Sequence, residues 1–131
     1  MYKRQPLWHK FVFIASTSGL ASLARTAPYD LFQLPAARAT LRAALQEVDA
    51  VGRAHGIAMD ADIVDRQYQM ALNLKPGIKP SMQLDMEQGK RLEIDALNGA
   101  VVRLAAAKGL ATPVHQTIYV ALKMEDQRRQ A

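Results

Sequence analysis

Apolar residues recur three and four positions apart along almost the whole chain, and this spacing most limits what it can fold into. Pro6, Pro35 and Pro113 each precede such a stretch, and His55-Gly56 closes one. Spacing of this kind, bounded by proline and glycine, is typical of amphipathic helices. No stretch alternates polar and apolar residues over the length of a useful strand. The sequence therefore predicts an all-α domain of five or six helices joined by short loops.

The composition indicates a folded intracellular domain. The chain has 131 residues, half of them hydrophobic, which suffices for one core and argues against disorder. It has no cysteine, so disulfides and cysteine-ligated zinc are excluded, and a cytoplasmic location is expected. No apolar run approaches the roughly 18 residues that span a bilayer, so we expect no membrane partner. A secretory signal over residues 11–23 is a weaker alternative, because this stretch has the aromatic bulk of a core helix.

The net charge is +5, which would permit binding to phosphate or nucleic acid. The basic residues are scattered rather than clustered, which favours a solvated surface. We therefore expect no nucleic-acid partner, and a basic nucleic-acid-binding domain is the weakest alternative.

The pattern divides the chain into three parts. Residues 1–5 are polar and basic without periodicity, so we expect a disordered leader, one that resembles a translated sequencing adapter rather than native sequence. Residues 6–124 carry the helical pattern, and residues 125–131 form a charged, frayed tail.

Lys10 is the one charged residue in the first apolar helix, among Leu7, Trp8, Phe11 and Ile14. Its stem can lie on apolar surface while the ammonium reaches water. Alternatively, the lysine is partly desolvated and serves as a proton donor.

The stretch from Ser81 to Gly99 interleaves polar and apolar positions at helical spacing. Ser81 is expected to cap one helix, which either ends or bends at Gly89, and Glu93 is expected to begin a second helix that runs to Lys108. The two helices are either simply capped surface elements, or Ser81 and Glu93 form a polar site at their junction.

Other motifs for chemistry are missing from the sequence. His9, His55 and His115 lack a metal-ligand spacing, so we expect no metal site and interpret them as surface or capping residues. The seven glycines never occur two apart, which excludes G-x-G-x-x-G and leaves the chain without a recognisable means of binding a nucleotide by itself.

A set of short motifs nevertheless resembles the C-terminal domain of ketopantoate reductase (2-dehydropantoate 2-reductase), a 6-phosphogluconate dehydrogenase C-terminal-like fold. The resemblance covers residues 7–123, and order and spacing are preserved. Its motifs are Trp8-x-Lys10, Lys79-Pro80-Ser81-Met82-x-x-Asp85, Glu93-Ile94-Asp95-x-x-Asn98-Gly99 and Thr112-Pro113.

This resemblance implies the second domain of an NADPH-dependent 2-keto-acid reductase of the pantothenate pathway. The family's N-terminal Rossmann domain, which binds most of the cofactor, is absent from this chain, so a fragment that is inactive alone is expected, with a homodimer as a further expectation. Lys10 matches the general acid, Ser81 a substrate contact, and Glu93 the glutamate where cofactor and substrate meet.

The chain departs from the family at two positions. Asparagine is common four and eight residues after the lysine, where this chain has Ile14 and Ser18. Ser18 can still hydrogen-bond a substrate, but Ile14 cannot. Weaker binding of ketopantoate, or a more apolar substrate, is expected. The alternative function is a non-catalytic helical interaction or dimerisation module derived from this domain.

Overall fold

The computed structural model describes residues 4–130, which form seven helices and no strand. The all-α fold is thereby confirmed, and the number of helices exceeds the expectation because the turn at Pro28 is a short helix. The helices are α1 (Arg4–Ala24), α2 (Pro28–Leu31), α3 (Pro35–Ala54), α4 (Ile63–Leu72), α5 (Ser81–Glu87), α6 (Asn98–Ala106) and α7 (Pro113–Gln130).

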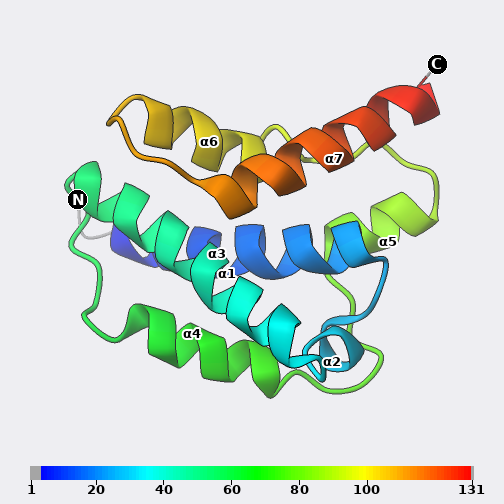
Figure 1. The fold of residues 1–131 in the computed structure, drawn as a ribbon, viewed down its shortest axis with the longest axis horizontal. Coiled ribbons are helices and arrows are strands. Elements are labelled where there is room, and N and C mark those ends of the chain that lie inside the picture. Colours follow the sequence, from blue (N-terminus) through cyan, green and yellow to red (C-terminus); the bar gives the residue numbers. More distant parts are fainter. Residues whose placement is uncertain (1–3, 131) are drawn as a thin grey trace.

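Helix α1 lies at the centre of the bundle and packs against all the other helices (Figure 1). Its sequence is apolar or small on almost every side, as a helix surrounded by neighbours requires. Gly19 is essential to this packing. A Cβ atom there would lie 2.6 Å from Nδ2 of Asn98 and 3.1 Å from the Ile118 side chain. The missing side chain therefore lets α1 approach α6 and α7 closely.

The core consists of two hydrophobic clusters. The larger contains buried residues of α1, α3, α4 and α6, and the smaller joins α5, α7 and the segment before α6. Leu20 and Leu97 pack against both clusters, so the domain has one continuous interior.

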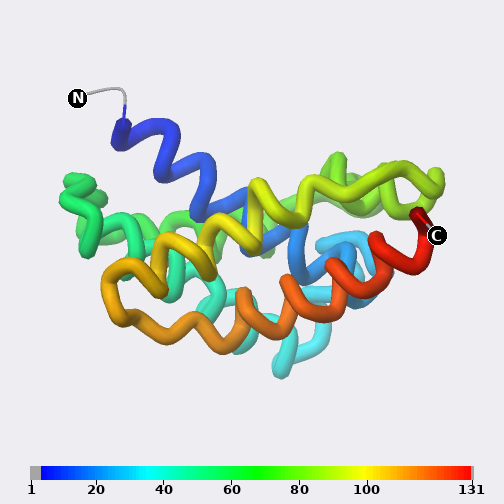
Figure 2. Tube along the Cα trace, turned by 90° about the horizontal axis from the view of Figure 1, so that it is seen from above, coloured from blue at the N-terminus to red at the C-terminus, as the bar shows by residue number. Residues whose placement is uncertain are grey.

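Both ends of the helical region extend further than the sequence predicted. Arg4 and Gln5, expected in a disordered leader, form the first turn of α1 because their side chains donate hydrogen bonds to the carbonyls of His55 and Ala58. Residues 1–3 of that leader lie outside the described residues. Residues 125–130, expected as a frayed tail, are the last turns of α7. The start of α1 and the end of α7 lie at opposite ends of the long axis (Figure 2).

Contacts with neighbouring segments explain why α7 stays helical to its end. The carboxylate of Asp126 is buried and accepts a hydrogen bond from the Leu92 amide at 2.9 Å. Arg129 donates to the Lys90 carbonyl at 2.6 Å. These charged side chains are tied to the segment after α5, and are not simply solvated.

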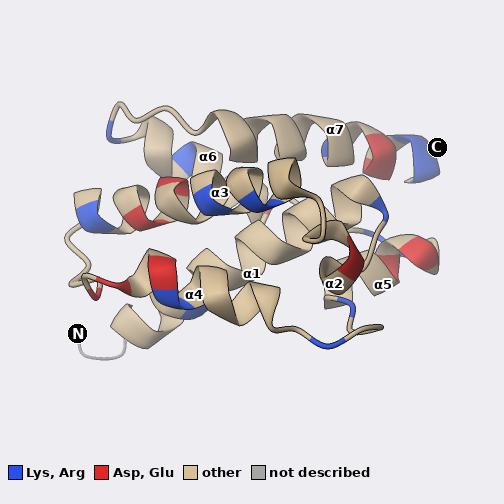
Figure 3. Cartoon of the chain, turned by 60° about the horizontal axis from the view of Figure 1, so that its bottom comes forward, with Lys and Arg blue, Asp and Glu red and all other residues tan. Residues whose placement is uncertain are grey.

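Lysine and arginine are spread over the helices and loops rather than gathered on one face in the view of Figure 3. Several are paired with carboxylates, among them Arg53 with Asp49 and Arg66 with Asp62. None of the helices within residues 4–130 has the length and apolar character that crossing a membrane requires.

The start of α7 is capped by a carboxylate from another helix. The Glu47 side chain of α3 accepts hydrogen bonds from the amides of Val114 at 2.9 Å and His115 at 3.0 Å. These amides have no partner within α7, so the carboxylate satisfies them. Burial raises the pKa of Glu47, and the two amide hydrogen bonds counteract part of this rise.

Replacing Glu47 with alanine is expected to lower the free energy of unfolding by about 1–2 kcal/mol, because the capping interaction is lost. Urea unfolding of the purified chain measures this change. Glu87→Ala serves as the control, since it removes only the exposed ion pair with Lys79, which is worth about 0–1 kcal/mol. Equal effects of the two substitutions would contradict the capping role.

Candidate functional site

A pocket of about 200 Å³ lies between α1, the start of α2 and the connection from α4 to α5. Two residues predicted to contact substrate, Ser18 and Ser81, line it together with Ile14. The remaining lining residues are Phe13, Thr17, Pro28, Leu74, Ile78, Lys79 and Pro80. The fold thus brings together residues that are more than sixty positions apart in the sequence.

A larger depression of about 510 Å³ exists on the surface of α7, but its lining comes from that helix alone: Pro113, Gln116, Thr117, Val120 and Ala121. None of the predicted site residues contributes to it. We therefore take the pocket beside α1 as the candidate site.

The periodicity of α1 explains how its residues reach the pocket. Lys10, Ile14 and Ser18 are four positions apart and share one face of the helix. Ile14 and Ser18 line the pocket, and Lys10 lies one turn before Ile14 on the same side. Lys10 is exposed, which agrees with the first of its two interpretations, a stem on apolar surface with the ammonium in water, rather than with partial desolvation. Lys10 itself is not among the residues that line the pocket.

Ser81 is positioned differently from the prediction. Pro80 takes the capping position of α5, with φ −62° and ψ 155°, and Ser81 is the first helical residue. The serine side chain makes no capping hydrogen bond. Its exposed hydroxyl remains at the wall of the pocket and can contact a ligand.

Ser18 is almost completely buried, with 3% of its surface exposed. Within residues 4–130 its hydroxyl has no hydrogen-bond partner, whereas the neighbouring Thr17 hydroxyl donates to the Phe13 carbonyl at 2.8 Å. The Ser18 hydroxyl oxygen is not among the fully enclosed side-chain atoms that lack a partner, and the residue lines the pocket. Ser18 therefore offers a ready polar contact for a molecule in the pocket.

Lys79 lines the pocket but is already paired. Its ammonium contacts both carboxylate oxygens of Glu87, at 3.0 and 2.9 Å. Lys10 has no such carboxylate neighbour among the residues that the structure describes. Of the two lysines, Lys10 therefore keeps all of its N–H donors for a bound ligand, whereas Lys79 has committed two of its three.

Glu93 does not line the pocket. It is exposed in the segment between α5 and α6, and the predicted helix start at this residue is wrong, because α6 begins at Asn98. The side chain of Asp95 explains the difference. It accepts hydrogen bonds from Tyr119 and Lys123 of α7, both at 2.7 Å, and these contacts hold the segment against α7.

The same contacts fix the charge of Asp95. The hydrogen bonds from Lys123 and then from Tyr119 hold the pKa of Asp95 below its usual value, and they raise the pKa of Lys123. Asp95 is thus committed to a structural role, while the exposed carboxylate of Glu93 has no ion pair within the described chain.

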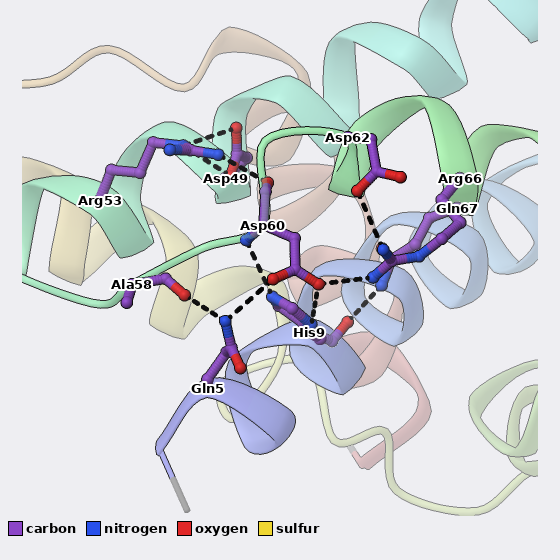
Figure 4. A network of polar contacts seen from close by, with 9 residues as sticks. All are labelled: Gln5, His9, Asp49, Arg53, Ala58, Asp60, Asp62, Arg66 and Gln67. Atoms are coloured by element: carbon purple, nitrogen blue, oxygen red, sulfur yellow. Dashed lines mark hydrogen bonds and ion pairs between the residues drawn. The ribbon is translucent and has the colours of Figure 1, made fainter. Parts of the chain in front are cut away.

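A polar network holds the turn of α1 that carries Lys10 (Figure 4). Gln67 of α4 donates to the His9 carbonyl at 2.6 Å. Asp60 accepts hydrogen bonds from Gln5 at 3.1 Å and from Arg66 at 3.0 Å. The backbone beside Lys10 is therefore tied to α4 and to the loop that precedes it.

Comparison with known proteins identifies the family of this chain. Residues 4–126 match the family described as ketopantoate reductase PanE/ApbA C terminal. The chain belongs to this family. The resemblance inferred from the short motifs is thereby confirmed.

Relatives of the ketopantoate reductase domain include both named reductases and uncharacterized oxidoreductases. The chain is 30% identical over 118 residues to the uncharacterized oxidoreductase YkpB of Bacillus subtilis, covering 90% of this chain and 39% of the relative. It is 35% identical over 82 residues to 2-dehydropantoate 2-reductase of Caulobacter vibrioides, covering 63% and 28%. For the Vibrio cholerae enzyme of that name, the values are 30% over 125 residues, covering 95% and 42%. The chain thus spans about two fifths or less of these relatives.

Solved structures show the same helical domain. A dimeric ketopantoate reductase from Staphylococcus aureus superposes with a TM-score of 0.89 at 25% identity, covering 95% of this chain and 43% of that one. A ketopantoate reductase from Ralstonia eutropha JMP134 gives 0.90 at 26%, covering 98% and 43%. D-mandelate dehydrogenase in complex with NADH shares the fold, with a TM-score of 0.81 at 20% identity and coverage of 92% and 42%.

Sequence reasoning missed the buried polar network behind α1 of this ketopantoate reductase domain. Nδ2 of Asn98 donates to the Ala15 carbonyl and to Nδ1 of His115, both at 3.0 Å. Nε2 of His115 donates to the Ala44 carbonyl at 2.9 Å. The interpretation of His115 as a surface or capping residue is therefore wrong, since none of its surface is exposed.

Burial lowers the pKa of His115 to about 4, so the ring is neutral near neutral pH. The network joins α1, α3, α6 and α7, and its contacts with α1 are made by Ala15 and Gly19, which face a different side of the helix from the pocket residues Ile14 and Ser18. The only sequence signal for it was Asn98 within the family motif, because a single histidine in a helical pattern carries no sign of its burial.

Proposed function

We propose that this chain is the substrate-binding and catalytic domain of an NADPH-dependent reductase of 2-keto acids, of the 2-dehydropantoate 2-reductase type. The observation that carries the proposal is the pocket beside α1, which Ser18 and Ser81 both line and whose Ile14 lies one helical turn from Lys10. Membership of the ketopantoate reductase family supports the reaction class.

In this proposal, Lys10 is the general acid. Its ammonium donates a proton to the keto oxygen of the substrate and stabilises negative charge that develops there. Because Lys10 is exposed, the amine can regain its proton from solvent. Ser81 and Ser18 donate hydrogen bonds to the oxygens of the 2-keto acid and so orient it.

NADPH supplies the hydride when it is bound, and most of its contacts would come from a preceding Rossmann domain. Glu93 fits a contact with the cofactor and the substrate, because its carboxylate is exposed and, unlike Asp95, has no ion pair within residues 4–130. A carboxylate in this state can accept hydrogen bonds from hydroxyl or amide groups and orient them.

The 131-residue chain alone is expected not to oxidise NADPH in the presence of ketopantoate, whereas a protein extended upstream by an in-frame dinucleotide-binding domain should do so. Sequencing the source DNA upstream of the codon for Pro6, followed by an absorbance assay of NADPH oxidation on both proteins, tests this prediction. Turnover by the short chain would contradict the assignment of the cofactor to another domain.

An upstream region without such a domain would favour the alternative, a helical interaction module that kept the fold of the enzyme. The extended protein is further expected to be a homodimer, by analogy with the dimeric ketopantoate reductase of Staphylococcus aureus. Sedimentation equilibrium would detect this, and a monomer would contradict it.

A further inference from the structure

Most of the lining of the pocket beside α1 is apolar. Its apolar lining comes from Phe13 and Ile14 of α1, Leu74 and Ile78 of the connection to α5, and the prolines at positions 28 and 80. These groups belong to three separate segments. A ligand side chain in the pocket is therefore surrounded by apolar atoms from several directions.

Few polar groups in the pocket remain free for a ligand. The Thr17 hydroxyl donates to the Phe13 carbonyl, and the Lys79 ammonium is held by Glu87. This leaves the hydroxyls of Ser18 and Ser81. Two hydroxyls can serve the carboxylate and keto oxygens at one end of a 2-keto acid, and the apolar side chains that make up most of the lining offer neither donor nor acceptor to a polar group at its other end.

We propose that the pocket selects 2-keto acids with a compact hydrocarbon side chain over those that carry a hydroxyl on the side chain. The inference rests on the proposed function, because it assumes that a 2-keto acid binds here. The pocket volume of about 200 Å³ is smaller than the ~300–1,000 Å³ typical of pockets for drug-sized ligands. A branched alkyl group of a few carbons matches this volume.

Ile14 is the residue that decides the selectivity. It lines the pocket one turn from Ser18, and its side chain has neither a donor nor an acceptor. A side-chain hydroxyl placed against it would lose its hydrogen bonds to water without replacement. An apolar pocket rejects an added hydroxyl by about a hundredfold at most, so a preference of about tenfold to a hundredfold is expected.

The test compares two acids that differ only in this hydroxyl. Ketopantoate carries a terminal hydroxyl, and 3,3-dimethyl-2-oxobutanoate has a hydrogen in its place. Each is titrated into the uniformly ¹⁵N-labelled 131-residue chain, and the amide resonances of Ile14, Ser18 and Ser81 are followed by NMR. We expect both acids to shift these resonances, with a dissociation constant about tenfold or more lower for the acid without the hydroxyl.

The variant Ile14→Asn should reduce or reverse the preference, because the amide can bond to the hydroxyl, and Ile14→Val should keep it. Met70→Asn is the matched control, since Met70 is half exposed on α4 and does not line the pocket. It should leave the preference unchanged. The dispersion of the same spectra reports whether each variant is folded, and the comparison of the two acids on the unaltered chain needs no variant.

The outcomes separate the two claims. Equal affinity for the two acids, or a preference for ketopantoate, would overturn the selectivity and leave the proposed function standing. A failure of both acids to shift the pocket resonances would count against the proposed function itself. Shifts confined to the surface of α7 would overturn both the location and the selectivity.

Discussion

Replacing Lys10 with alanine is expected to lower kcat of the extended, NADPH-oxidising enzyme by about 10²–10⁴-fold, the usual contribution of a positioned general acid. The structure supports a specific role for this lysine. It lies one turn from the pocket, it has no carboxylate partner among the described residues, and the His9 carbonyl beside it is anchored by Gln67. The effect should fall on kcat more than on KM, because the proton is transferred only as the reaction proceeds.

Steady-state NADPH oxidation with a saturating 2-keto acid measures this loss. Lys108→Ala provides the matched control, since Lys108 is an exposed lysine near the end of α6 and should leave kcat unchanged. Addition of a small primary amine should restore part of the activity of Lys10→Ala, because the amine can replace the missing donor. A kcat close to that of the unaltered enzyme would show that another group donates the proton.

Acidification is expected to destabilise the domain through His115. Both ring nitrogens are engaged in the neutral form, since Nε2 donates to Ala44 and Nδ1 accepts from Asn98. A proton on Nδ1 would face the Asn98 amide donor across 3.0 Å. The folded state therefore binds this proton less readily than the unfolded chain, and burial lowers the pKa of His115 from 6.5 to about 4.

The direction of the effect follows from the lowered pKa. Above pH 6.5 the histidine is neutral in both the folded and the unfolded state, so its titration does not reduce the free energy of unfolding. Between pH 6.5 and about 4 only the unfolded chain takes up the proton, so the free energy of unfolding decreases as the pH is lowered. The shift corresponds to a loss of about 3 kcal/mol by the lower end of this range. The raised pKa of Glu47 acts in the opposite direction, because its contribution falls as pH rises.

Urea unfolding of the chain at a series of pH values measures the loss. His115→Gln, whose amide can still donate to Ala44, should be less stable near neutral pH but should lose most of the slope. His55→Gln should keep the slope, because His55 lies at the end of α3 away from this network. A stability that is flat across the range, or that rises on acidification, would contradict the role of His115.

Local chemistry explains which parts of the fold could be predicted. Pro35 and Pro113 mark the first residues of α3 and α7, and Gly56 and Gly109 follow the ends of α3 and α6 with φ of +82° and +67°. Proline fits the first turn of a helix and glycine tolerates positive φ. The residue types at these positions therefore suffice to predict the helix boundaries.

Long-range contacts explain the failures. Nothing near Glu93 in the sequence indicates that Asp95 pairs with Lys123, or that the Leu92 amide bonds to Asp126. Because of those contacts, α6 begins at Asn98 and not at Glu93, where the sequence predicted its start. His115 was misinterpreted for the same reason, because its partners Asn98 and Ala44 lie on two other helices.

The candidate site was predictable in its members rather than in its geometry. The family motifs pointed to Ser18 and Ser81, and both line one pocket. Their spacing in the sequence did not show that Ser81 would be free of capping, that Lys10 would be exposed, or that Glu93 would lie outside the pocket. The catalytic and binding roles of these four residues remain predictions.

The central helix separates two kinds of residue that are neighbours in the sequence. Ile14 and Ser18 line the pocket, while Ala15 and Gly19 contact the Asn98 side chain across the helix. Successive residues of an α-helix point about 100° apart, so a substitution on one side barely disturbs the other. Over evolutionary time, substrate preference can therefore drift through single replacements at the pocket face without the need for compensating changes in the interior, whereas Gly19 should tolerate almost none.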